Sequence, residues 1–182
     1  MDEPTEILTP RLRLCCWRDT HRDAFAAMHR DPEVMADLGG PIDREESDRK
    51  FDRYVETFRI YRTSRWAVEA PDGTFLGYSG VMARPDTTHP LGFHHEIGWR
   101  FNRMAWGHGY ATESAAAALD HAVRITGLTR IVAYALPTNL RSHAVMERLG
   151  FRRRQDLDFT MPMDDGGTFE AMMWDVETAK YS

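Results

Sequence analysis

The stretch GWRFNRMAWGHGYATESAAAALDHAV, residues 98–123, runs from an apolar segment through two glycines into an alanine-rich segment. The second segment predicts a helix that ends at Gly127, because apolar residues recur with helical spacing at positions 111, 115, 118, 119, 122 and 123. Gly107 and Gly109 precede this helix, where the first backbone N–H groups lack partners and face the positive end of the helix dipole. The turn is therefore either a site for phosphate oxygens or a tight turn with a structural role alone.

Two well-known phosphate-binding patterns do not fit this turn. A P-loop needs Lys and then Ser or Thr after its last glycine, whereas Tyr110 and Ala111 follow Gly109. The dinucleotide-binding fingerprint needs a third glycine at the position of Thr112.

Hydrophobic periodicity predicts the elements on either side of the turn. Strands are expected at 11–17, 65–70, 74–82, 92–101, 129–136, 151–159 and 168–176, with a turn at 164–167. Helices are expected at 19–31, 43–62, 111–127 and 139–150, with an irregular segment at 33–40. We therefore predict an α/β (α+β) domain spanning residues 1–182, built on a single mixed, mostly antiparallel sheet of about seven strands with helices on both faces. The fourth and fifth strands, 92–101 and 129–136, should be parallel neighbours because a right-handed helical crossover joins them.

Length and composition favour a protein of the cytoplasm. A chain of 182 residues with 42% hydrophobic residues suits one packed domain. It contains no apolar run of the roughly 20 residues that a membrane span needs, and the acidic start lacks the pattern of a signal peptide. Cys15 and Cys16 are adjacent in a predicted strand and point to opposite faces, so we expect no disulfide between them.

Charge is distributed unevenly around a net value of -5. Residues 100–154 contain nine arginines against three carboxylates, so the rest of the chain is strongly acidic. This asymmetry reflects either solvated helix faces or an anion-binding half opposed to a half that suits a cation. The run Arg152–Arg154 could suggest nucleic-acid binding, but its charges alternate across a predicted strand of an acidic protein, so no such partner is expected.

Two longer segments, EIGWRFNRMAWGHGYATESAAAALDHA (96–122) and LPTNLRSHAVMERLGF (136–151), resemble the GNAT N-acetyltransferases. The opening LTPRLRL (8–14) is similar to the branch of ribosomal-protein N-terminal (Rim-type) acetyltransferases, so the resemblance covers nearly the whole chain. It implies the GNAT fold, acetyl-CoA as cosubstrate, and acetyl transfer to a primary amine by direct attack in a ternary complex. The alternative is a non-catalytic acyl-CoA-binding regulatory domain.

The resemblance also implies which residues hold the coenzyme. Backbone amides of the turn would bind its pyrophosphate, namely those of Gly107, His108, Gly109, Tyr110, Ala111 and Thr112. The exposed backbone of Trp99, Arg100 and Phe101 would pair with the pantetheine arm as an added strand. Trp106 stands where the wider superfamily has Gln or Arg, a replacement common in the Rim-type branch.

Three polar side chains of these two segments have more than one interpretation. Asn139 would contact the coenzyme, or cap a helix, or do both. Arg141 and Arg103 are phosphate partners or exposed side chains.

Acetyl transfer needs a base, a donor to the oxyanion and help for the departing thiolate. Glu96 is the candidate base, acting directly or through water, and its alternative role is an ion pair with an arginine. By resemblance, Ser142 protonates the thiolate or donates a hydrogen bond to the sulfur. A main-chain N–H near Ile97–Trp99 would meet the oxyanion, with Gly98 allowing a kink or bulge.

The acceptor is a protein N terminus or a small-molecule amine. Deprotonation at pH 7 costs about 1 to 1.4 kcal/mol for an α-amine and about 4.6 kcal/mol for a lysine, so an α-amine demands less of the base. Acidic residues early in the second helix, Glu45, Glu46 and Asp48, would suit a cationic amine. His89, His94 and His95 lack the spacing of a zinc site, so no metal is expected. We also expect no membrane partner, and a protein that is a monomer or a homodimer.

Overall fold

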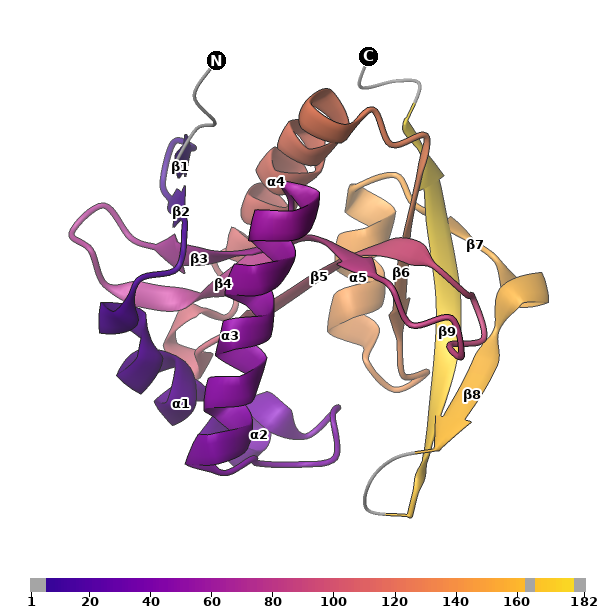
Figure 1. The fold of residues 1–182 in the computed structure, drawn as a ribbon, viewed down its shortest axis with the longest axis horizontal. Helices are drawn as coiled ribbons and strands as arrows, with labels where there is room; N and C mark the ends of the chain where they lie inside the picture. The colour runs from indigo at the N-terminus through magenta and orange to yellow at the C-terminus, as the bar shows by residue number, and fades with distance from the viewer. Residues whose placement is uncertain (1–5, 163–165, 179–182) are drawn as a thin grey trace.

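The computed structural model describes residues 6–162 and 166–178. Figure 1 shows one mixed sheet with helices on both faces. The strands are β1 (Glu6–Leu8), β2 (Arg13–Cys15), β3 (Arg65–Glu69), β4 (Phe75–Arg84), β5 (His94–Phe101), β6 (Arg130–Ala135), β7 (Arg152–Arg153), β8 (Phe159–Pro162) and β9 (Thr168–Glu177). The α-helices are α1 (Arg22–Arg30), α2 (Pro32–Met35), α3 (Arg44–Tyr61), α4 (Tyr110–Thr126) and α5 (Leu140–Arg148), and the 3-10 helices are η1 (Asp19–His21), η2 (Arg103–Ala105) and η3 (Gln155–Leu157).

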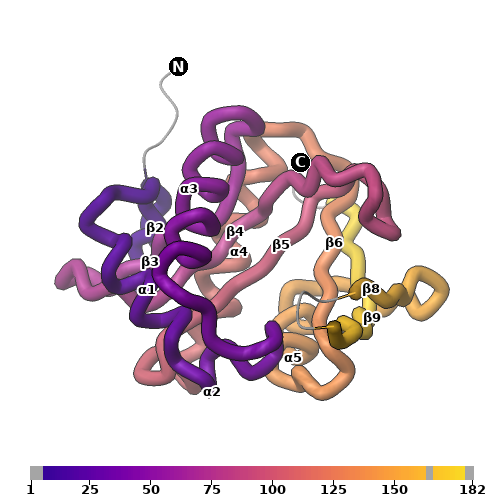
Figure 2. The backbone as a smooth tube through the Cα atoms, turned by 60° about the horizontal axis from the view of Figure 1, so that its bottom comes forward, coloured from indigo at the N-terminus to yellow at the C-terminus, as the bar shows by residue number. Residues whose placement is uncertain are grey.

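The strands follow the order β1-β2-β3-β4-β5-β6-β9-β7, and β8 pairs with β9. Neighbouring strands are antiparallel except β5 and β6, which run parallel. These two strands share a single register pair, Glu96 with Val132. Beyond this pair β5 and β6 diverge, as Figure 2 shows, while every residue of β5 stays paired with β4.

The two faces of β5 carry different kinds of side chain because residues alternate across a strand. Ile97 and Phe101 are buried in the clusters that include α4. Glu96 and Arg100 point to the opposite face, which α1 and α3 cover. The charged residues of β5 thus face the layer of α3.

Helix α4 lies close against the sheet because its buried side is made of small residues. Ala115, Ala118 and Ala122 are at most 1% exposed, and Leu119 is fully buried with them. On the other face, α1 and α3 pack an aromatic cluster against β4 that includes Phe25, Phe51, Tyr54 and Tyr78.

The predicted order of strands and helices, the helices on both faces and the parallel pair are confirmed. The described residues form nine strands, which is more than the seven or so expected. The predicted strand 11–17 is present as β2, and the additional strand β1 pairs with it across a turn in which the N–H of Thr9 donates to the carbonyl of Leu12.

The predicted strand 151–159 breaks into β7, η3 and the start of β8. The break follows from Asp158, which pairs with Arg153 at 2.5 Å and accepts a hydrogen bond from the backbone N–H of Met173. The irregular segment after Asp31 contains α2, because Asp31 accepts from the first amides of that helix. The predicted turn at 164–167 lies partly outside the described residues.

Candidate functional site

A cavity of about 260 Å³ opens where β5 and β6 diverge. Its walls come from β3, β4, β5, β6, α3, α5, β8 and β9. Five of the residues predicted from the sequence line it: Glu96, Trp99, Arg100, Asn139 and Ser142. The fold therefore gathers candidate residues from two distant segments around one space.

Glu96 lies at the point where the two parallel strands separate. Its Oε1 accepts from Nη2 of Arg65 at 3.0 Å, its Oε2 accepts from the hydroxyl of Tyr134 at 3.0 Å, and Nε of Arg84 lies 3.5 Å from Oε2. Burial alone would raise the pKa of Glu96, but the charges of Arg65 and Arg84 lower it below the ordinary value. Glu96 is thus an ionised carboxylate beside the cavity, and the ion pair considered from the sequence is present.

Arg65 reaches Glu96 from β3 by crossing β4. Its guanidinium also donates to the carbonyls of Gly80 and Glu96. A Cβ atom at Gly98 would lie 2.6 Å from Nη2 of Arg65, so the glycine provides the space for this guanidinium. The prediction that Gly98 allows a kink or bulge was wrong, because the β4–β5 register is continuous through it.

The glycine turn leaves a row of backbone donors open to solvent. Gly107 and Gly109 both have φ of 78°, and Gly109 is the N-cap of α4 without a side-chain capping bond. Among the described residues, no hydrogen bond is found for the amides of residues 107–112. Gly107, His108 and Gly109 are exposed, and Tyr110, Ala111 and Thr112 form the first turn of the helix. These free amides at a helix N-terminus fit an anion.

The N-terminal hairpin holds the turn in place. Glu113, in the first turn of α4, accepts from the Thr9 hydroxyl at 2.6 Å and from Nε of Arg11 at 2.7 Å. Nη1 of Arg11 also donates to the carbonyl of His108 at 2.9 Å. The contribution of Arg11 was not predicted, since residues 11 and 113 are far apart in the chain.

The position held by Trp106 has a packing role. Its indole N–H donates to the carbonyl of Phe101 at 2.9 Å. The guanidinium of Arg141, which is exposed, lies 3.9 Å from the centre of a Trp106 ring. Arg103 is paired with Asp31 at 2.8 Å and with Glu33 at 2.6 Å. Of the two predicted phosphate partners, only Arg141 has no carboxylate on it within the described chain.

Asn139 caps α5 and also contacts the other side of the cavity. Its Oδ1 accepts from the N–H of Ser142 at 3.1 Å, which confirms the capping role. Its amide donates to Asp37 at 2.7 Å, and Asp37 pairs with Arg100 at 2.8 Å. Ser142 is half-buried and lines the cavity one turn into α5.

The side chain of Arg100 fastens β5 to the α2 segment. It donates to the carbonyl of Val34 as well as to Asp37. Burial alone would lower its pKa, but Tyr78 and Asp37 raise it above the ordinary value. The side chain of Phe101 is buried with 5% exposure, so only the backbone of this residue is available for the pairing implied by resemblance.

The charge asymmetry of the sequence is largely cancelled by pairing. Arg152, Arg153 and Arg154 each pair with a carboxylate, at 3.1, 2.5 and 2.8 Å respectively. The acidic residues expected to face the acceptor do not line the cavity: Glu45 pairs with Arg49 and Asp48 pairs with Arg44 on the outer side of α3. An acidic helix start places its charges toward solvent, so these carboxylates do not contribute to this cavity.

The histidines of β5 pack against aromatic rings. His94 lies on the same side of the strand as Glu96, and its ring centre is 4.6 Å from that of His89. Burial lowers the pKa of His89, His94 and His95.

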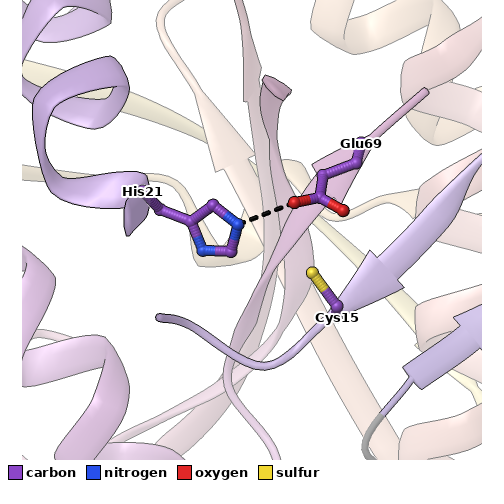
Figure 3. A group of neighbouring side chains, drawn as sticks. All are labelled: Cys15, His21 and Glu69. Atoms are coloured by element: carbon purple, nitrogen blue, oxygen red, sulfur yellow. Dashed lines mark hydrogen bonds and ion pairs between the residues drawn. The ribbon is translucent and has the colours of Figure 1, made fainter. Parts of the chain in front are cut away.

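Figure 3 shows another polar cluster, formed by Cys15, His21 and Glu69, and none of these residues lines the cavity. Its ligand-type atoms lie within 4.8 Å of one another, the only such trio in residues 6–162 and 166–178. Glu69, however, already accepts from Arg13, Arg18 and His21. Nδ1 of His21 accepts from a backbone N–H, so the proton sits on Nε2 and is donated to Glu69. Burial and then Glu69 raise the pKa of Cys15 to about 11, so the thiol stays protonated and the cluster serves to tie η1 to β2 and β3.

Sequence reasoning missed the partners of Glu96. Arg65 is a charge inside a buried strand, and Tyr134 lies on the strand predicted to run parallel to that of Glu96. Polar residues on two neighbouring parallel strands would have been the signal for Tyr134.

No helix among the described residues is both long enough and apolar enough to cross a bilayer.

Known proteins resemble this chain in sequence and in fold. A family model described as "Acetyltransferase (GNAT) domain" matches residues 11–152. The uncharacterized protein YkkB of Bacillus subtilis is 30% identical over 152 residues, covering 82% of this chain and 87% of YkkB. The FsC-acetyl coenzyme A-N(2)-transacetylase of Aspergillus fumigatus is 28% identical over 153 residues, covering 81% of this chain and 65% of that protein. The ribosomal-protein-S5-alanine acetyltransferase of Vibrio fischeri has the same fold, with a TM-score of 0.76 at 13% identity over 98% of this chain and 100% of that chain.

Proposed function

The chain belongs to the GNAT acetyltransferase family and is an acyltransferase, and we propose that it transfers an acetyl group from acetyl-CoA to a primary amine by direct attack in a ternary complex. It would do so in the cytoplasm as a monomer or homodimer, without a metal, nucleic-acid or membrane partner. The observation that carries the proposal is the row of free amides at residues 107–112, which follow β5 in the chain, together with the ionised carboxylate of Glu96 that β5 places at the cavity. The Aspergillus relative, whose name specifies acetyl coenzyme A and N(2), supports the same reaction.

The coenzyme would lie along β5 and end at the start of α4. Amides of Gly107 to Thr112 would hold its pyrophosphate, since they face solvent at the positive end of a helix. The backbone of Trp99, Arg100 and Phe101 would accept the pantetheine arm, because β6 has turned away from this part of β5. Arg141 and Asn139 lie at the start of α5 and would complete the site.

Glu96 would take the proton that the amine nitrogen loses. A carboxylate with a lowered pKa is ionised at neutral pH but is a weak base toward an ammonium ion. It would therefore bind the ammonium group, directly or through water, and take one proton from it, and the neutral amine so formed would attack the carbonyl carbon with its free electron pair. The oxyanion would be met by a main-chain N–H of Ile97–Trp99.

Ser142 would serve the sulfur end of the reaction. As the C–S bond breaks, its hydroxyl would donate a hydrogen bond or a proton to the departing thiolate. We predict that Ser142→Ala lowers kcat by about tenfold, the worth of a hydrogen bond made in the transition state, with little change in coenzyme affinity. Thr138→Ala, exposed and outside the cavity lining, is the matched control. Unchanged kcat in Ser142→Ala would remove the residue from the mechanism.

The proposed function is tested by thiol release from acetyl-CoA over N-terminal peptides and small amines. We expect release with at least one amine and a loss of about 100-fold in kcat for Glu96→Gln. Coenzyme binding without release over the whole panel would instead support the acyl-CoA-binding regulatory domain. Coenzyme binding itself, measured by calorimetry, should persist in Glu96→Gln because its carboxylate lies away from the glycine turn.

A further inference from the structure

Two basic side chains of α3 face the cavity without an acidic partner. Lys50 and Arg53 are three residues apart, so they share one side of the helix, and both line the cavity. Within the described chain neither forms an ion pair. Other arginines of the same helix do pair with carboxylates, such as Arg49 with Glu45 at 2.6 Å. The positive charge of Lys50 and Arg53 is therefore available to a ligand.

Positive charge also exceeds negative charge over the rest of the lining. The described lining contains five basic side chains and two carboxylates: Lys50, Arg53, Arg65, Arg84, Arg100, Asp37 and Glu96. Both carboxylates are already engaged, Glu96 by two arginines and Asp37 by Arg100 and Asn139. A cationic substrate would add to this excess, whereas an anion would offset it.

The neighbouring groups respond to the same excess. Burial lowers the pKa of Lys50, and the charges of Arg100 and Arg53 lower it further. Burial would raise the pKa of Tyr78, but Lys50 and Arg100 outweigh it and lower that pKa. The buried Nε of Arg100 finds no acceptor among the described residues. A negative group in the cavity would raise the pKa of Lys50 and of Tyr78 toward their ordinary values and would offer an acceptor to Nε of Arg100.

Resting on the acetyl transfer proposed above, we propose that the acceptor is a small primary amine that carries a carboxylate or a phosphate, bound through Lys50 and Arg53. The cavity of about 260 Å³ suits a molecule of the size of an amino acid. With its anionic group on α3, the amine would extend toward Glu96. The nitrogen then forms the bond to the acetyl carbon, the C–S bond breaks, and the proton lost by the nitrogen balances the one gained by the thiol.

The test compares acceptors that differ only in charge. Thiol release is measured with α-amino acids against their amides, and with O-phosphoethanolamine against ethanolamine. We expect kcat/KM to be at least tenfold higher for the anionic member of one of these pairs, and the pair that shows it distinguishes carboxylate from phosphate. In Lys50→Met/Arg53→Gln this ratio should fall at least tenfold, while Arg49→Gln, which removes a paired charge outside the cavity, should preserve it.

Equal or higher kcat/KM for the neutral members, or a ratio unchanged in the double variant, would overturn the proposal. If no amine is acetylated, the proposed function fails but the anion site is still tested by thermal denaturation with the same amino acids and with O-phosphoethanolamine. A rise in Tm in the original chain that disappears in the double variant would support the site. No rise in Tm would overturn it.

Discussion

His29 should make the protein less stable as the pH falls below neutral. Its side chain is fully buried in α1, where Nδ1 donates to the carbonyl of Phe25 at 2.8 Å and Nε2 has no partner among the described residues. Burial, followed by the charge of Lys50, lowers the pKa of His29 to about 3. Protonation would place a charge in the aromatic cluster beside Phe25 and Tyr78.

The magnitude follows from the pKa in the folded and unfolded states. An unfolded chain takes up the proton near pH 6.5 and the folded chain near 3, so the unfolded state binds more protons over this range and stability falls as the pH falls. Between pH 7 and pH 5 the loss from this one side chain is about 2 kcal/mol in the free energy of unfolding. The loss begins near 6.5, well above the range in which carboxylates titrate.

The assay is urea denaturation at pH 7 and pH 5 for the original chain and for His29→Gln, which keeps an N–H donor but does not titrate. Other groups titrate in both proteins, so their effects cancel in the comparison. The stability difference between the two proteins should shift by about 2 kcal/mol between the two pH values in favour of the variant at pH 5. His108→Gln, at an exposed position, is the control. The same difference at both pH values would refute the reasoning.

Two further predictions concern the turn and the carboxylate. Gly109→Ala should cost about 1–2 kcal/mol of stability and weaken coenzyme binding, because a Cβ is disfavoured at φ of 78°. Gly127→Ala, with φ of 67° at the other end of α4, should cost a similar amount without changing the coenzyme Kd in calorimetry, and equal Kd values for both variants would contradict the assignment of the turn. Tyr134→Phe removes a donor to Glu96, so the pKa of Glu96 should rise and the acid limb of kcat/KM should move upward by about one pH unit, as followed by thiol release. An unmoved acid limb would show that Glu96 does not set the pH dependence.

Local patterns predicted the parts of the fold that depend on neighbours in sequence. Helix α4 and the free turn before it follow from apolar spacing and two glycines, and the Asn139 cap follows from its place before α5. The break near residue 158 was missed, since it depends on a contact with Met173 that no local pattern shows. The surroundings of Glu96 were also missed, because Arg65 lies 31 residues away and reaches it only through the register of β3 and β4.

The absence of a side chain at Gly98 couples this position on β5 to Arg65 on β3, although β4 lies between the two strands. A larger residue there would collide with the guanidinium of Arg65, while a shorter residue at 65 would leave Glu96 with less positive charge and an unfilled void. Relatives that replace one of the two residues should therefore replace the other as well. A designer who wishes to retune the proton affinity of this carboxylate has a matched pair of substitutions to vary, with neither of them at the carboxylate itself.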